Sequence, residues 1–159
     1  MVMVTGFAIN IYHYLCALIF RSMIYITRKE TFSAAHKLSR KEWTDAKNLE
    51  VFGKCANPNW HGHNYELTVT VKGEINPETG FVANLSDVGK ILHAKVISKV
   101  DHKNLNLDVD FMKDKLPSTE VLAIEIWNQV ESPINALGCK LHCVKIQETE
   151  KNFVEYFGK

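Results

Sequence analysis

Alternating hydrophobic and polar residues predict several β-strands towards the two ends of the chain. The clearest alternation runs through residues 64–72, where Tyr65, Leu67, Val69 and Val71 fall on one face. The same criterion predicts four further strands, at residues 23–32, 81–83, 140–147 and 153–157. Residues 73–80, with a proline and a final glycine, predict the hairpin turn that follows the clearest strand.

Two segments between these strands have the apolar spacing of amphipathic helices. The first follows Ser86, which we expect to cap it, and ends near Val100. The second follows Ser118 or Thr119 and should end at Pro133, because proline removes a helical hydrogen bond. The order of strands, two helices and strands favours an α+β fold with an antiparallel sheet and both helices on one face.

Two other segments are not predicted to form a strand or helix of this α+β domain. Residues 40–59 mix charged residues, Asn, Gly and Pro without a period, which predicts a long loop of the kind that often carries function. Residues 1–20 carry no charge and could form a short membrane span, but they lack the basic start and cleavage site of a signal peptide. We expect residues 1–22 to be an apolar extension and 23–159 to form a single domain; an organelle or membrane role for the extension is the alternative.

Composition narrows the class of protein. A chain of 159 residues with 46% hydrophobic and 23% charged residues is typical of one globular domain. Nineteen basic and eighteen acidic residues leave a net charge of +1, so we expect neither a nucleic-acid partner nor stable membrane association. The few cysteines form no C-x-x-C pair, which predicts free thiols in a reducing, cytoplasmic environment. They are Cys16, Cys55, Cys139 and Cys143.

Three histidines form the strongest candidate for chemistry. His61 and His63 directly precede the clearest strand, and residues i and i+2 of a strand point to the same face about 6.5–7 Å apart. His36 follows the first predicted strand, and an antiparallel neighbour could place it opposite this pair. Three imidazoles with an open fourth position are typical of catalytic zinc, although an isolated H-x-H pair is usually a surface feature.

Four further residues each have a functional and an ordinary interpretation. Cys55 could close a structural zinc site as a fourth ligand, or act as a thiolate base; the spacing does not choose between them. Asp101 and His102 could form an acid–base pair, or place a cation at a helix end. Glu148 could accept hydrogen bonds from a bound ligand that is rich in donors, or lie at a solvated strand edge.

Several separated motifs, in this order, resemble 6-pyruvoyl-tetrahydropterin synthase. They are F-S-A-A-H around His36, F-G-K-C-A-N-P-N-W-H-G-H-N-Y at residues 52–65, G-E-I-N-P-E-T-G at 73–80, D-H-K-N-L at 101–105, S-T-E at 118–120 and E-T after Gln147. The resemblance covers the chain from about residue 24 and leaves the first 22 residues unmatched. It departs at Trp60, where the family pattern has a small glycine before H-G-H.

The resemblance implies a fold, an assembly and a reaction. The fold would be a four-stranded antiparallel sheet packed on two helices, with subunits joined in barrel-forming trimers that pair as hexamers. The substrate would be 7,8-dihydroneopterin triphosphate, converted to 6-pyruvoyl-tetrahydropterin and inorganic triphosphate in tetrahydrobiopterin biosynthesis. The residues that the resemblance assigns are, for zinc, His36, His61 and His63; for proton transfer, Cys55, Asp101 and His102; and for the pterin, Thr119, Glu120 and Glu148.

Two other functions remain as alternatives. A 6-carboxy-tetrahydropterin synthase of the deazapurine pathway should have three residues between the cysteine and H-G-H, whereas this chain has five between Cys55 and His61. A catalytically silent zinc or pterin-binding module would not need Cys55, Asp101 and His102. The chain has no G-x-G-x-x-G fingerprint, which fits an elimination that needs no nicotinamide.

Overall fold

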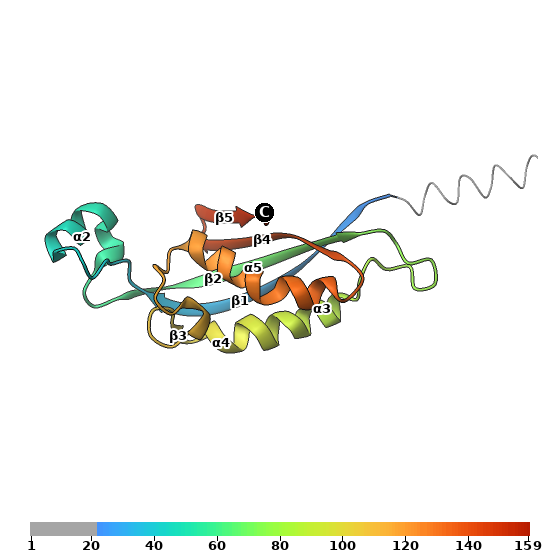
Figure 1. The fold of residues 1–159 in the computed structure, drawn as a ribbon, viewed down its shortest axis with the longest axis horizontal. Helices are drawn as coiled ribbons and strands as arrows, with labels where there is room; N and C mark the ends of the chain where they lie inside the picture. The colour runs from blue at the N-terminus through green and yellow to red at the C-terminus, as the bar shows by residue number, and fades with distance from the viewer. Residues whose placement is uncertain (1–21) are drawn as a thin grey trace, which may run out of the picture.

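A mixed sheet with helices on one face forms the body of the protein (Figure 1). The computed structural model describes residues 22–159, and the strand order in its sheet is β3-β1-β2-β4-β5. The strands are β1 (Ile24–His36), β2 (His61–Gly73), β3 (Lys103–Asn104), β4 (Lys140–Thr149) and β5 (Asn152–Tyr156). The helices are α2 (Asp45–Phe52), α3 (Leu85–Leu92), α4 (Ser98–Val100) and α5 (Thr119–Asn135), with a π-helical segment, His93–Ile97, joining α3 to α4.

The central ribbon of the sheet is formed by β1 and β2. They pair antiparallel along their whole length, from Ile24 opposite Gly73 to His36 opposite His61. β4 and β5 extend the antiparallel sheet, as expected. The expected count of four antiparallel strands is wrong, because β3 adds a fifth strand, which runs parallel to β1. A two-residue strand has too few side chains to show an alternation, so this edge had no signal in the sequence.

The core lies between the sheet and the helices. On β2, the predicted apolar face is confirmed: Tyr65, Leu67, Val69 and Val71 are at most 2% exposed. Fully buried side chains of α3, its π-helical continuation and α5 cover this face: Val88, Leu92, Val96, Leu122, Ile126 and Val130. The apolar spacing therefore identified both helices and the side of the sheet that they cover.

The ends of the helices differ from the sequence-based expectation. The side chain of Asn84, not that of Ser86, caps α3: its Oδ1 accepts the backbone N–H of Ser86 at 2.9 Å. No strand forms at residues 81–83, which lead into this cap. Ser118 caps α5 as predicted. The helix continues past Pro133, because the fully buried Ile134 keeps its last turn in the core.

The expected loop at residues 40–59 contains a short helix, α2, which stands away from the sheet (Figure 1). Thr44 caps it by accepting the N–H of Lys47, and the buried Asn48 ties it to both the N–H and the carbonyl of Arg40. Leu49 is 60% exposed, so α2 has no buried apolar face to give it a periodic signal. A 3₁₀ turn, Gly53–Ala56, follows α2 and leads the chain back towards β2.

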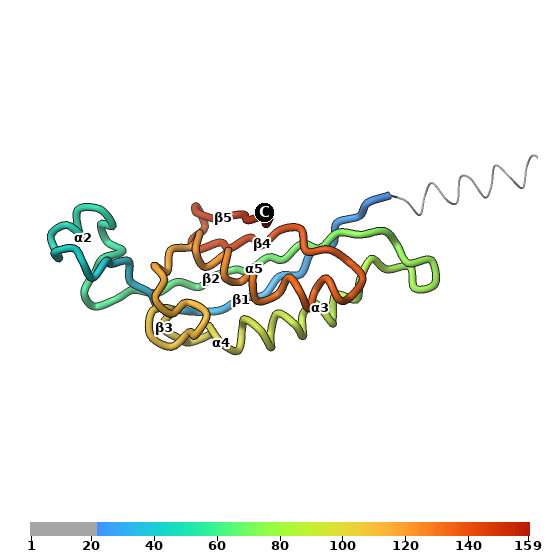
Figure 2. The backbone as a smooth tube through the Cα atoms, in the orientation of Figure 1, coloured from blue at the N-terminus to red at the C-terminus, as the bar shows by residue number. Residues whose placement is uncertain are grey.

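The backbone trace shows two excursions from the sheet, at its opposite ends (Figure 2). The first carries α2, and the second is the turn between β2 and α3. The expectation about residues 1–22 falls almost entirely outside the described part of the chain. Within residues 22–159, no helix combines the length and apolar character needed to cross a membrane.

Candidate functional site

Three histidine rings converge where the β1–β2 ribbon ends. The register places His36 directly opposite His61, and His63 lies two residues further along the same face of β2. The ring centroids are 4.4 Å apart for His36 and His61, 5.0 Å for His61 and His63, and 5.3 Å for His36 and His63. One nitrogen from each ring lies within 4.8 Å of the others, so the predicted convergence is confirmed.

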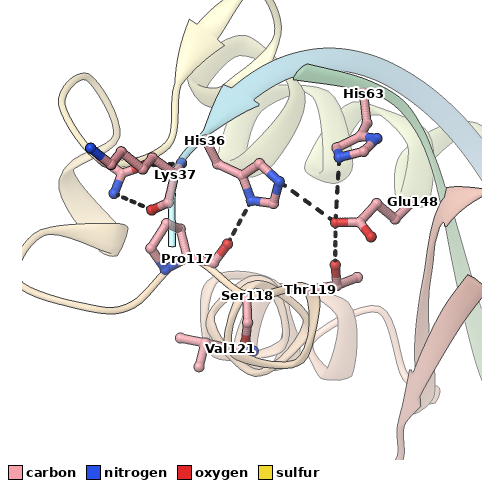
Figure 3. Close-up of polar contacts among 9 residues, drawn as sticks. His36, Lys37, His63, Pro117, Ser118, Thr119, Val121 and Glu148 are labelled. Atoms are coloured by element: carbon pink, nitrogen blue, oxygen red, sulfur yellow. Dashed lines mark hydrogen bonds and ion pairs between the residues drawn. The ribbon is translucent and has the colours of Figure 1, made fainter. Parts of the chain in front are cut away.

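A backbone carbonyl fixes the orientation of His36. Its Nδ1 lies 2.8 Å from the carbonyl oxygen of Pro117, the residue before the cap of α5 (Figure 3). A nitrogen in this position donates its hydrogen to the carbonyl, which leaves the lone pair of Nε2 directed at the other two rings. Metal-binding histidines are held in this way, by a second partner on the far nitrogen.

Four buried nitrogens of the three histidines lack hydrogen-bond partners. His36 Nε2, both nitrogens of His61, and His63 Nε2 are buried and make no hydrogen bond within the described structure. Burial lowers the pKa of all three histidines, so they favour the neutral form that binds metals. Buried polar atoms without partners are costly, and a metal ion on these lone pairs would satisfy them. The donor set therefore fits a metal ion.

The carboxylate of one β4 residue lies close to two of the three histidines. Glu148 Oε1 lies 3.7 Å from His36 Nε2 and 3.8 Å from His63 Nε2, and it accepts the hydroxyl of Thr119 at 2.9 Å (Figure 3). Glu148, Thr119 and Glu120 line one cavity of about 300 Å³, which His36 also lines. The structure thus brings the three expected pterin-binding residues to one cavity beside the histidines.

Cys55 lies beside the histidine cluster and not within it. The residue belongs to the 3₁₀ turn after α2, and its carbonyl accepts the N–H of Leu38 at 2.8 Å. Cys55 lines the cavity of Glu148, and also a neighbouring one that His61 and His63 line. Burial, together with the negative charge of Glu148, raises the pKa of the Cys55 thiol.

Asp101 and His102 form a pair, but in a different place. Asp101 Oδ1 accepts the N–H of Ser33, and Oδ2 lies 3.0 Å from His102 Nδ1. The hydrogen bond from Ser33, followed by that from His102, lowers the pKa of Asp101. The His102 side chain is 82% exposed and lines a hollow with Ser33 and Asn64, which point to the sheet face opposite the helices. Within one chain, this pair and Cys55 do not line the same cavity.

Two further residues flank the His61–His63 pair in the chain. Trp60 has a φ of 66°, a left-handed conformation that favours glycine, and this explains why the family pattern has glycine there. Trp60 is not among the residues that line the two cavities of Cys55. Tyr65 packs its ring edgewise on His63, with centroids 5.6 Å apart. Tyr65 is the next residue after His61 and His63 on the same face of the strand. This alternation could have identified Tyr65 from the sequence as a neighbour of the histidines.

Known proteins resemble this chain over most of its length. Residues 25–159 match the profile of a family described as 6-pyruvoyl tetrahydropterin synthase. The 6-pyruvoyl tetrahydrobiopterin synthase of Homo sapiens is 43% identical over 141 residues, which cover 87% of this chain and 94% of that protein. The solved structure of Caenorhabditis elegans 6-pyruvoyl tetrahydropterin synthase superposes with a TM-score of 0.81 at 38% identity, covering 87% and 97% of the two chains. The 6-carboxy-5,6,7,8-tetrahydropterin synthase of Bacillus subtilis (strain 168) is 33% identical over 132 residues, 80% of each chain.

Proposed function

This chain belongs to the 6-pyruvoyl tetrahydropterin synthase family, and on that basis we propose that it is a lyase that converts 7,8-dihydroneopterin triphosphate to 6-pyruvoyl-tetrahydropterin and triphosphate. The observation that carries the proposal is the convergence of His36, His61 and His63 beside both Cys55 and Glu148. Elimination with internal oxidation of the side chain needs a Lewis acid and groups that move protons, and this site offers both.

The resident metal of the proposed enzyme is zinc, bound by His36, His61 and His63. Neutral imidazoles are preferred zinc ligands, and three of them leave a position open for chemistry. Zinc, when bound, supplies Lewis acidity that lowers the pKa of a hydroxyl in contact with it. The support for a metal here is the set of buried ring nitrogens without partners.

Cys55 is the proposed proton acceptor for the substrate side chain. Its thiol is not part of the cluster of metal-binding atoms, which favours the base over the fourth structural ligand. The pterin ring is proposed to lie in the cavity of Glu148, Thr119 and Glu120. There a carboxylate can accept two hydrogen bonds from the amino-pyrimidine edge of the ring.

Completing the proton-transfer set requires a second copy of the chain. His102 lines a hollow that Cys55 does not line, and Asp101 pairs with His102 and lines neither cavity of Cys55. We therefore assign them to a neighbouring subunit's site, in a homo-oligomer that we expect to be a hexamer of two barrel-forming trimers. The free thiols of Cys55, Cys139 and Cys143 fit the proposed cytoplasmic location.

The carboxy-tetrahydropterin synthase function has less support. The relative with that name is 33% identical, against 43% for the human pyruvoyl enzyme, and the longer spacing between Cys55 and His61 points the same way. Synthases among the relatives also favour an enzyme over a silent binding module.

The decisive experiment is incubation with 7,8-dihydroneopterin triphosphate, followed by identification of the products. We expect 6-pyruvoyl-tetrahydropterin with one equivalent of inorganic triphosphate, and no product after the metal is removed with a chelator. A 6-carboxy product would establish the alternative enzyme. Tight binding without turnover by the zinc-loaded protein would establish the silent module.

A further inference from the structure

The two cavities that Cys55 lines differ in charge. One has a volume of about 300 Å³ and is lined by two carboxylates, those of Glu120 and Glu148. The other has a volume of about 760 Å³ and is lined by two of the three histidines and by Lys54. Among the described residues that line this larger cavity, Lys54 is the only lysine, arginine or acidic residue. An anion beside the histidines is therefore disfavoured in the first cavity and favoured in the second.

Backbone hydrogen bonds hold the turn that carries Lys54. This residue belongs to the 3₁₀ turn Gly53–Ala56, and its carbonyl accepts the N–H of Asn57 at 3.2 Å. The next carbonyl, that of Cys55, accepts the N–H of Leu38 at 2.8 Å. Since Leu38 lies two residues beyond the end of β1, this contact ties the turn to the central ribbon of the sheet. The position from which the Lys54 side chain extends is thus fixed relative to the histidines.

The ammonium group of Lys54 is free to bind a ligand. Within residues 22–159, five other lysines pair with a carboxylate: Lys29, Lys47, Lys90, Lys115 and Lys145. Lys54 forms no such pair in this part of the chain, and its side chain is exposed. Its three N–H donors can therefore all turn towards an acceptor in the cavity, and phosphate oxygens are strong acceptors for an ammonium group.

The proposed substrate brings an anion to this part of the site. In 7,8-dihydroneopterin triphosphate, a single three-carbon side chain carries the hydroxyls and, at its far end, the triphosphate. When the hydroxyls reach the histidines, the triphosphate is only a few bonds away and must enter a cavity beside them. The smaller cavity would place its negative charges against Glu120 and Glu148, whereas the larger one offers the cation of Lys54.

We propose that the larger cavity binds the triphosphate of the substrate, with the Lys54 ammonium group in contact with the phosphate oxygens. This inference rests on the proposed function, because that function supplies the substrate. Lys54 then distinguishes the triphosphate ester from free dihydroneopterin, which has the same ring and hydroxyls but no leaving group. The same contact makes inorganic triphosphate a ligand of the cavity after its release.

Inorganic triphosphate is the direct probe of this contact. Its dissociation constant is measured by calorimetry on the full zinc-loaded chain, and the zinc content is measured again afterwards because polyphosphates bind free metal ions. Lys54→Gln removes the charge, so triphosphate binding should weaken by about 10–100-fold, as expected for loss of a hydrogen bond to a charged group. Lys54→Arg keeps the charge and should keep most of the affinity. Lys41→Gln replaces an exposed lysine that lines neither cavity of Cys55, and it should change nothing.

Two pterin compounds test the same residue with the ring present. The KM for 7,8-dihydroneopterin triphosphate should rise by about 10–100-fold in Lys54→Gln. The dissociation constant for 7,8-dihydroneopterin, which has no phosphate, should be the same in wild type and variant. Unchanged binding of this compound, together with unchanged zinc content, also shows that Lys54→Gln is folded.

The outcomes separate this inference from the proposed function. Equal binding of inorganic triphosphate by wild type and Lys54→Gln overturns the proposal, because the anion would then be held by the metal or by other cations. Absence of triphosphate binding to the wild type overturns it as well. Both results are obtained without turnover, whereas failure to form 6-pyruvoyl-tetrahydropterin in the product assay overturns the proposed function. Weaker triphosphate binding in Lys54→Gln, with Lys54→Arg and Lys41→Gln close to wild type, establishes the contact.

Discussion

At the scale of single residues, the histidines and Cys55 are neighbours that should respond differently to substitution. His63→Ala removes one of the converging nitrogens, so most of the metal and nearly all activity should be lost. Cys55→Ala should keep the metal, because the thiol is outside the cluster, yet slow turnover by about 10²–10⁴-fold, as is typical when a general base is lost. Zinc content and rate measured on the same preparations distinguish the two effects.

Cys143→Ala is the matched control for loss of a thiol. Cys143 is buried in β4 and is not part of the histidine cluster, so this variant should keep its zinc and its turnover. Loss of zinc together with folding stability in Cys55→Ala would make Cys55 a structural ligand. Full zinc content in His63→Ala would remove His63 from the metal site.

The residue types of the proposed metal site were predictable from the sequence, but their environment was not. The period of a strand alone puts His61 and His63 on one face, and antiparallel pairing with the preceding strand adds His36. The approach of Glu148 depends on β4 lying next to β2, which requires the strand order. The sequence pairs Asp101 with His102, but only the folded chain shows that the hollow lined by His102 is not one that Cys55 lines.

At the scale of elements, the start of α3 provides a test of capping. Asn84→Ala removes the oxygen that accepts the N–H of Ser86, so the free energy of unfolding should fall by about 1 kcal/mol. Ser86→Ala keeps that N–H and should have little effect. Urea denaturation of both variants at one protein concentration makes the comparison, since oligomer stability depends on concentration. Equal losses in the two variants would contradict the assignment of the cap.

Elements that bury an apolar face were predictable, and those that do not were missed. The apolar alternation at residues 64–72 and the helical spacing that ends near Val100 both correspond to side chains in the core. α2 exposes Leu49, and β3 is held by backbone pairing with Ala34 and Ala35, so neither leaves a hydrophobic pattern. The extent of α5 depends on burial of Ile134, which outweighs the local effect of Pro133.

At the scale of the whole molecule, the proposed shared site predicts complementation between inactive chains. Cys55→Ala and His102→Ala should each be nearly inactive alone. Oligomers reassembled from both should regain activity, because some sites then combine an intact Cys55 from one copy with an intact His102 from another. The measurement is turnover after the two chains are denatured together and refolded.

The control replaces His102→Ala with the double variant Cys55→Ala/His102→Ala. This mixture contains no intact Cys55, so it should remain inactive. Absence of recovery in mixed oligomers that contain both single variants would place Cys55 and His102 in one subunit's site, or remove His102 from the chemistry.

The pairing of β1 with β2 also has a consequence for how the protein folds. Within this ribbon, the pair with the smallest sequence separation is His36 with His61, and every later pair towards Ile24 and Gly73 closes a longer loop. The entropy cost of closing a loop grows with its length, so the contact that costs least to form first is the one between two of the proposed metal ligands. Zinc captured by these side chains in a partly folded chain would start the zipping of the central ribbon, and the free energy of metal binding would then contribute directly to folding.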